Sequence, residues 1–247
     1  MNTQHPELLA SCWTSAGDVM PARGADYSPI PIQTRIEATA AAGYVGFGLT
    51  RPDLVRARDS IGLGTLAKML RDNGIRYVQL EWLTDWWTTG AARAASDRVR
   101  ADLFGAAPIL GVDHIKVGAD DNGVPVEYEV LCEGFDRLAD DAKSAGVRIA
   151  FENTPFTHHV KTTEEAVAFV TTVGNPNGGL LLDIWMPTVA RRPTRRFLRW
   201  CRRKSSSAWN STMGAPRWWA PIWRILSITG FLAGQEFSMF PASSTRC

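Results

Sequence analysis

The stretch Gly-Val-Arg-Ile-Ala-Phe-Glu-Asn-Thr-Pro, residues 146–155, contains the pattern that decides the fold of this chain. Gly146 stands where a helix often ends, because a C-terminal cap favours a residue that tolerates the left-handed conformation. The apolar run that follows is typical of a buried strand, and it ends in the acid Glu152. The stretch therefore predicts a helix end, a strand, and a carboxylate at the C-terminal end of that strand.

Similar short apolar runs recur along the chain, spaced so that one helix and two loops fit between them. The predicted strands are Leu8–Ser11, Tyr44–Leu49, Tyr77–Glu81, Ile115–Gly118, Arg148–Glu152 and Leu180–Asp183. Intervening segments show helical periodicity, as in Leu131, Phe135 and Leu138. Thr162 and Glu165 form a capping box that predicts a helix over 164–173.

Alternating strands and helices predict an α/β fold with a parallel sheet. An open doubly-wound sheet would fit the same alternation, but no Gly-x-Gly-x-x-Gly follows any predicted strand, so dinucleotide binding lacks its signature. A chain of 247 residues has the usual length of a (β/α)8 barrel. We therefore predict such a TIM barrel over residues 1–185, incomplete because that portion supplies about six strand–helix units.

Composition limits the compartment and the partners. No run of about 20 apolar residues exists to cross a membrane, and the first seven residues lack the order of a signal peptide. The four cysteines stand far apart with no Cys-x-x-Cys spacing, which argues against a disulfide framework. A cytoplasmic protein is expected.

Charge divides the chain in two. Residues 1–185 hold 24 acidic and 16 basic side chains, whereas residues 186–247 hold one acid and 11 basic side chains. Half of the ten tryptophans also fall in residues 186–247. We therefore treat residues 1–185 as the barrel portion and residues 186–247 as an atypical basic tail.

Three acids close predicted strands: Glu81, Glu152 and Asp183. An acid at the end of a buried strand is costly to desolvate unless it is paired or bound to a metal. One such acid could form a salt bridge or a helix cap at the barrel mouth. Three at one rim favour a functional site, because working residues of such barrels stand at the C-terminal strand ends.

Phe-Glu-Asn-Thr-Pro (151–155) and Gly-Leu-Leu-Leu-Asp-Ile-Trp (179–185) resemble strands five and six of the xylose-isomerase-like sugar phosphate isomerase/epimerase family. The resemblance implies that Glu152 and Asp183 bind one divalent metal and that Glu152 also acts as acid and base. Carboxylates suit Mn2+ or Mg2+, and a histidine ligand would admit Co2+ or Zn2+. Family members commonly carry a histidine three positions after the aspartate, where this chain has Met186.

The implied reaction removes a proton next to the carbonyl of a sugar or polyol. Isomerisation, epimerisation and the dehydration of an inosose-type ketone all begin with that step, and the sequence does not separate them. Glu81, Lys116 and Trp13 are the candidate substrate contacts; the alternatives are that Lys116 pairs with Glu81 or Glu152 and that Trp13 is a packing residue. His114 is interpreted as structural, and His158 and His159 as surface residues on a rim loop. Apurinic-site endonucleases share the barrel, but they use many histidine ligands, and none of the four histidines here closes a strand.

The tail has three explanations: a basic arm for nucleic acid or lipid, a disordered segment, or translation in a shifted reading frame. Joining the last base of each codon to the first two of the next forces Trp209–Asn210 to encode Glu and Trp218–Trp219 to encode Val. With G or C in third positions, residues 208–214 yield Val-Glu-Leu-Asp-Asp-Gly. These hidden strings resemble later strands of the same family, so we favour a frame slip near residues 185–186.

Such a slip would leave a barrel without its true last strands, with strands one and six as open edges unless the tail covers them. The product should then be poorly soluble and weakly active. The rival class is a non-catalytic protein that binds nucleic acid through the Arg-rich tail, which the frame hypothesis disfavours. A small sugar or polyol is the expected partner, no membrane is expected, and assembly into a homo-oligomer is compatible with the sequence.

Overall fold

The computed structural model describes residues 7–19, 27–119, 125–182 and 226–228. Strands and helices alternate along this part of the chain, as the sequence predicts. The strands are β1 (Leu8–Ala10), β2 (Gly46–Thr50), β3 (Tyr77–Leu83), β4 (His114–Val117), β5 (Arg148–Phe151), β6 (Gly178–Leu180) and β7 (Leu226–Ile228). The helices are α1 (Ile32–Ala41), α2 (Arg51–Ile61), α3 (Leu63–Asp72), α4 (Gly90–Leu110), α5 (Tyr128–Ser144) and α6 (Thr163–Val173).

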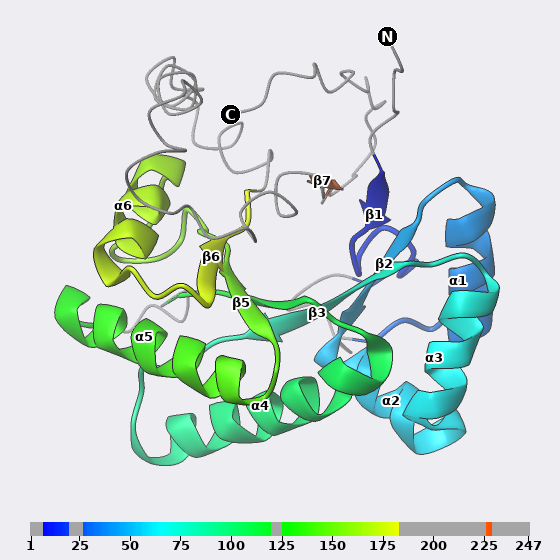
Figure 1. Ribbon diagram of the computed structural model, residues 1–247, viewed down its shortest axis with the longest axis horizontal. Helices are drawn as coiled ribbons and strands as arrows, with labels where there is room; N and C mark the ends of the chain where they lie inside the picture. Colours follow the sequence, from blue (N-terminus) through cyan, green and yellow to red (C-terminus); the bar gives the residue numbers. More distant parts are fainter. Residues whose placement is uncertain (1–6, 20–26, 120–124, 183–225, 229–247) are drawn as a thin grey trace, which may run out of the picture.

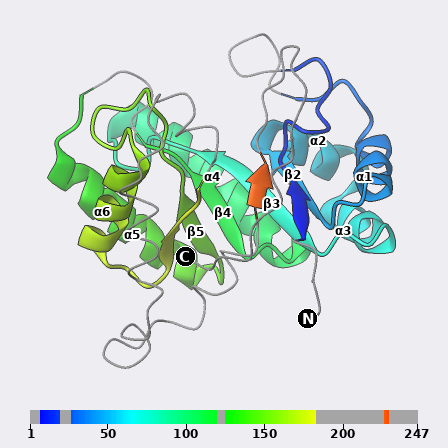
Figure 2. The same ribbon diagram turned by 90° about the horizontal axis from the view of Figure 1, so that it is seen from above.

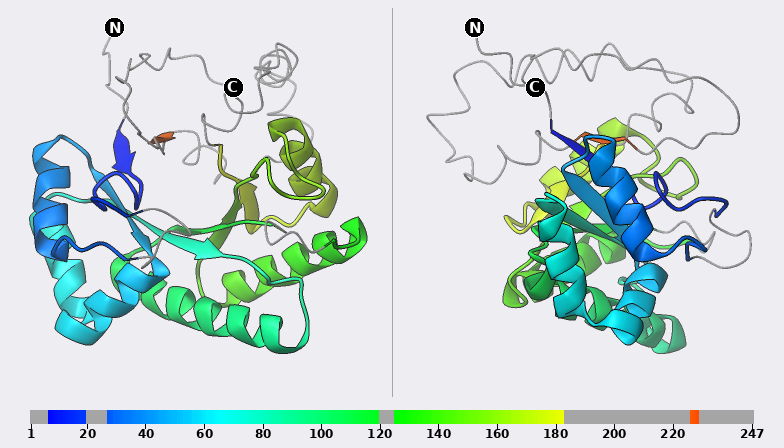
Figure 3. Two further views of the ribbon diagram at one scale, coloured as in Figure 1. Left: turned by 180° about the vertical axis from the view of Figure 1, so that it is seen from behind. Right: turned by 90° about the vertical axis from the view of Figure 1, so that its right-hand side faces the viewer.

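All strands belong to one parallel sheet with the order β6-β5-β4-β3-β2-β1-β7. The sheet curves, and the helices lie along its outer side (Figure 1). The view from behind shows the same arc of helices around the strands (Figure 3). This is the parallel β/α arrangement of a TIM barrel, and within the described residues the barrel is incomplete, as predicted.

Strand β7 comes from the basic tail and covers one of the two edges that the frame hypothesis leaves open unless the tail pairs with them. Leu226–Ile228 pair in parallel with Leu8–Ala10, so the edge of β1 is covered rather than open. The two strands lie side by side when the molecule is seen from above (Figure 2). Among the described residues, β6 pairs only with β5, which agrees with the expected open edge on that side.

The predicted helix patterns are confirmed where they can be followed. Leu131, Phe135 and Leu138 are buried on the inner face of α5. The capping box is present, since the Thr162 side chain accepts from the Glu165 backbone, and α6 begins at Thr163, one residue earlier than predicted. One helix was expected between β2 and β3, whereas two are found because Gly62, with a φ of 79°, breaks the helical path.

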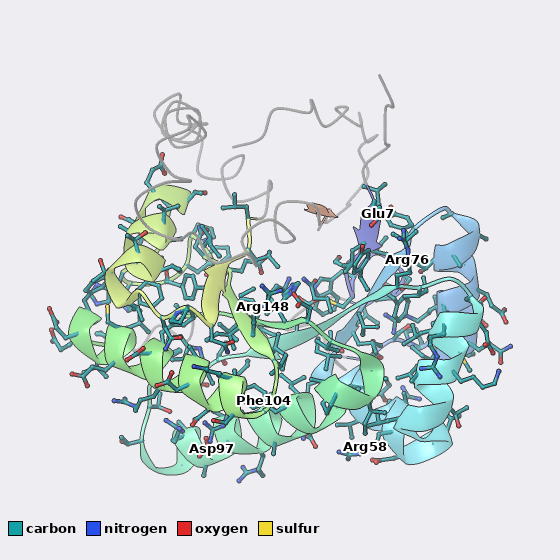
Figure 4. All side chains as sticks on the ribbon, in the orientation of Figure 1. Glu7, Arg58, Arg76, Asp97, Phe104 and Arg148 are labelled. Atoms are coloured by element: carbon teal, nitrogen blue, oxygen red, sulfur yellow. The ribbon has the colours of Figure 1, made fainter. Side chains whose placement is uncertain are left out.

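The N-terminal ends of the strands are tied together by charge. Arg76 Nη2 lies 2.5 Å from Glu7 Oε1, and the Tyr77 hydroxyl donates to Glu7 Oε2 at 2.7 Å. Glu7 and Arg76 lie next to one another beside β1 (Figure 4). Arg148, at the start of β5, pairs with Asp113, which precedes β4. This rim therefore carries structural ion pairs, and the opposite, C-terminal rim is left for chemistry. None of the helices in the described part of the chain is long and apolar enough to span a bilayer.

Candidate active site at the C-terminal strand ends

Side chains alternate between the two faces of each strand, and on three neighbouring strands this places a cluster of charged side chains on the inner face of the sheet. Side chains two residues apart on a strand share a face. Gln79 and Glu81 of β3 contact His114 and Lys116 of β4 respectively, and all four are buried. Ile115 and Val117, which alternate with His114 and Lys116 along β4, belong to the apolar core instead. The polar side chains therefore line the inner side, with Glu81 and Lys116 nearer the C-terminal rim.

Lys116 lies between two carboxylates. Its Nζ makes a close ion pair with Glu81 Oε2 and lies 3.2 Å from Glu152 Oε2, just after β5. The exposed fractions of Glu81, Lys116 and Glu152 are 3%, 3% and 5%. We call these three residues the carboxylate–lysine cluster. One cation and two anions leave this cluster with one net negative charge, inside a site nearly closed to water.

The electrostatic consequence for Lys116 is a fixed positive charge. Burial alone would lower the pKa of this ammonium, but Glu152 and Glu81 together raise it above its ordinary value. Lys116 therefore stays protonated throughout the neutral range. It serves as a hydrogen-bond donor and a charge, rather than as a base or a nucleophile.

The backbone after β1 closes the cluster from one side. The Cys12 N–H donates to Glu81 Oε1 at 3.4 Å, and the Cys12 side chain is fully buried. Burial, and then the Glu81 charge, raise the pKa of the Cys12 thiol well above its ordinary value. A Cβ at Gly48 would lie 2.5 Å from the Cys12 nitrogen, so only glycine lets this segment approach β2. Sequence reasoning missed this contact, because a backbone donor leaves no signal in residue type.

An aromatic ring lies beside the cluster at the mouth. Lys116 Nζ is 5.7 Å from the centroid of the Trp82 ring, within the range of a cation–π contact. The Trp82 ring occupies the space where a side chain at Gly118 would stand. The Gly118 carbonyl in turn accepts from Trp86 Nε1 at 2.7 Å. Trp82 therefore walls the site and is held in place by the end of β4.

The other residues singled out in the sequence differ in their burial and contacts. Trp13 is partly exposed in the turn that follows Cys12. Asp183 and Met186 lie outside the described residues. His158 is exposed as expected, but His159 is partly buried, bonds to the Val126 carbonyl and contacts the Tyr128 ring. His159 is thus a packing residue rather than a surface one. His114 opens β4, at the end away from the C-terminal rim, and contacts Gln79; its structural interpretation remains a prediction.

The described residues supply only part of the donor set that a metal ion needs. In the described part of the chain, no three His, Cys, Asp or Glu side chains gather closely enough to hold an ion. Glu152 nevertheless fits a ligand role. Its buried carboxylate offers oxygen donors at a C-terminal strand end, and Glu81 makes the closer contact with Lys116. Residue 152 therefore suits a hard divalent cation, while Glu81 balances the lysine.

Comparison with known proteins agrees with this architecture. The family described as xylose isomerase-like TIM barrel matches residues 36–192. No curated protein sequence matches the chain significantly. A xylose isomerase domain containing protein from Salmonella typhimurium LT2 is similar in structure, with a TM-score of 0.62 and 14% identity over 77% of this chain and 65% of that one.

Two further solved structures show the same fold. The IOLI protein with a bound zinc atom has a TM-score of 0.56 and 22% identity, over 64% of this chain and 59% of that one. D-psicose 3-epimerase with D-tagatose, from Clostridium cellulolyticum H10, has a TM-score of 0.53 and 21% identity, over 64% and 60%. This chain thus spans less than two thirds of the length of each of the three structures. With its parallel β/α sheet and a family match over most of its length, the chain belongs to the xylose isomerase-like TIM-barrel family.

Proposed function

We propose that this chain derives from a divalent-metal-dependent isomerase or epimerase that acts on a sugar, a sugar phosphate or a related polyol ketone. The observation that supports the proposal most is the carboxylate–lysine cluster. Three buried ionisable side chains from three neighbouring strands meet at the C-terminal ends of β3, β4 and β5. Buried charges of this kind at the mouth of a barrel are typical of a catalytic site.

The roles follow from charge and contact. The Glu152 carboxylate takes the proton from the carbon next to the substrate carbonyl and returns it to the product. The Lys116 ammonium donates a hydrogen bond to a substrate oxygen and stabilises the negative charge that develops there. Glu81 keeps Lys116 protonated and in place, and also borders the substrate. Trp13, in the turn after Cys12, contributes an apolar wall for the sugar.

A divalent cation is proposed to be held by Glu152 and Asp183. This assignment rests on the family resemblance of the two sequence segments, in which both acids follow neighbouring parallel strands, β5 and β6. Such a cation, when bound, supplies Lewis-acid polarisation of the carbonyl. Mn2+ and Mg2+ suit an oxygen donor set best, and Co2+ or Zn2+ would need nitrogen donors as well.

The solved structures of the same fold support the reaction class in general terms. They include D-psicose and D-allulose 3-epimerases, a 3-keto-D-glucoside 4-epimerase and a probable 3-DHS dehydratase. Dehydration of an inosose-type ketone starts with the same proton abstraction, so it is the second candidate within this site. The two are separated by product, since only the dehydratase releases water and a conjugated ketone. The cytoplasm is the proposed location.

The activity is proposed to be weak in the chain as it stands. We retain the hypothesis that the frame slips near residues 185–186, so that the family's ligands from strands seven and eight are missing. Losing residues that only support metal ligands already costs about 10- to 100-fold in affinity or activity. Loss of ligands should cost more.

The direct test is exchange of a substrate C–H proton with solvent deuterium, which detects the first step alone. The full chain is incubated in D2O with Mn2+ and a panel of ketoses that includes D-tagatose, and deuterium is measured by NMR. We expect slow, Mn2+-dependent exchange that Glu152→Gln lowers by about 100-fold or more, because general-base catalysis contributes that much.

The matched control is Glu133→Gln, an exposed glutamate on α5 whose side chain is 70% exposed. This variant should exchange at the wild-type rate. Exchange that is equally fast without added metal, or unchanged in Glu152→Gln, would refute the proposed function.

A further inference from the structure

Arg35 is a buried charge outside the carboxylate–lysine cluster. It lies on α1, an outer helix, yet only 2% of the residue is exposed. Its Nη1 pairs with Asp53 Oδ2 at 2.5 Å, and its Nη2 donates to the Cys12 carbonyl at 3.0 Å. Its Nε donates to Ser15 Oγ at 3.2 Å. One guanidinium therefore joins α1, the start of α2 and the segment after β1.

Asp53 extends this network to the other end of the connection between β1 and α1. Its Oδ1 accepts from the Ser28 backbone N–H at 2.9 Å. The Ser28 hydroxyl donates to the Ala16 carbonyl at 2.8 Å. Residues shortly after β1 and residues shortly before α1 are thus fastened to the same buried ion pair. Such a network is costly to break, because each partner would be left charged and without water.

The segment after β1 that this network holds contacts the carboxylate–lysine cluster through Cys12. The carbonyl of Cys12 accepts from Arg35 on the outer side, while its N–H donates to Glu81 on the inner side. Gly48 leaves the space for this approach. The chain of contacts therefore runs from Arg35 through the Cys12 backbone to Glu81, and from Glu81 to Lys116.

We infer that Arg35 is a positioning residue, which holds the Cys12 backbone against Glu81 and thereby fixes how Lys116 is shared between Glu81 and Glu152. Without this hold, Glu81 loses its backbone donor and the segment from Ser11 to Ala16 moves outward. Glu81 then has only Lys116 to balance its charge, so Lys116 is drawn toward Glu81 and away from Glu152, which displaces the hydrogen-bond donor that the proposed function assigns to the substrate. The effect on turnover rests on the proposed function, whereas the hold on Cys12 does not.

Arg35→Lys tests the inference. Lysine retains a charge for Asp53 but has no planar fork, so it gives up the bonds to Cys12 and Ser15 while the fold survives. The measurement is the rate at which iodoacetamide alkylates Cys12 in the native full chain, followed by mass spectrometry of the peptide that contains it. We expect the alkylation rate to rise about tenfold or more. The hydrogen bond from the Arg35 guanidinium to the Cys12 carbonyl is charge-assisted, and its loss should favour opening of the Cys12 segment by about that factor.

Leu138→Val is the control for general loosening. Leu138 is buried in α5 and belongs to the core, and none of the Arg35 contacts described above involves that helix. The control variant should alkylate Cys12 at nearly the wild-type rate. Ser15→Ala removes one of the three bonds and should give an intermediate rate. A rate in Arg35→Lys no higher than in Leu138→Val would overturn the inference.

A second measurement separates positioning from stability. At saturating ketose and Mn2+, the deuterium exchange rate should fall in Arg35→Lys and stay near the wild-type rate in Leu138→Val, because only the first displaces Lys116. Faster alkylation with an unchanged exchange rate would refute the link to Glu81. If no exchange occurs in the wild type, the proposed function fails, while the alkylation result still decides whether Arg35 holds the Cys12 segment.

Discussion

Lys116 keeps its positive charge in a buried position, where burial alone would lower the pKa of an ammonium. Glu81 and Glu152 reverse the effect of burial and raise its pKa. A group with a raised folded pKa stabilises the protein fully below its unfolded pKa, about 10.4 for lysine, and loses that contribution as the pH rises through the folded value. The stabilisation by Lys116 is therefore constant across the neutral range. Any pH dependence of the reaction near neutrality must come from another group.

Lys116→Met should lower the free energy of unfolding by about 3–5 kcal/mol at pH 7, because two buried carboxylates then lack their cation. Their repulsion favours protonation, so acidification should recover part of the loss. Urea unfolding at pH 7 and pH 5 measures this. Lys143→Met, at an exposed position of α5, should change stability by no more than about 0.5 kcal/mol. An equal loss at both pH values would show that the carboxylates are not paired through Lys116.

At the scale of elements, the ends of β3 and β4 are joined by an aromatic side chain. The Trp82 ring fills the place of a side chain at Gly118, and the register between these strands shifts between Leu80 and Leu83. The ends of β3 and β4 therefore form the mouth of the site, where the Trp82 ring packs into the space left by the missing side chain of Gly118. Gly105, inside α4, has no atom within 4 Å of the place where its Cβ would stand.

Gly118→Ala should therefore destabilise the protein by about 1–3 kcal/mol, the usual cost of forcing extra volume into a packed site. Gly105→Ala should instead stabilise it by about 0.5–1 kcal/mol through helix propensity. Thermal melts followed by near-UV circular dichroism compare the two, and the tryptophan signal should change only in Gly118→Ala. A melt of Gly118→Ala equal to that of the wild type would contradict the described position of Trp82.

The sequence predicts elements better than it predicts contacts. Five of the six strand runs and the Thr162 capping box are confirmed because apolar periodicity and caps are local signals, whereas β6 is Gly178–Leu180 rather than the predicted Leu180–Asp183. The clustering of Glu81 with Glu152 followed from their places at strand ends, and Lys116 was expected near them. The Arg35–Asp53 pair was not predicted, since it joins groups 18 residues apart through tertiary packing. The N–H of Cys12 was equally hidden, because every non-proline residue has one.

At the scale of the whole molecule, the barrel is not closed within the described residues. A complete barrel removes its sheet edges, and here β7 covers β1 while β6 pairs only with β5 in the described part of the chain. The tail that supplies β7 is also the part whose composition departs from the rest. Sequencing the gene across codons 185 and 186 tests the frame hypothesis, and an intact frame here and in close relatives would end it.

A Mn2+ titration of the full chain, followed by electron paramagnetic resonance, tests whether Glu152 and Asp183 bind one cation. We expect measurable binding that Glu152→Gln and Asp183→Asn each weaken by more than about tenfold, since loss of a ligand should exceed the loss of a supporting contact. Glu133→Gln should bind as the wild type does. Mn2+ affinity that is the same in all four proteins would contradict a shared cation between positions 152 and 183.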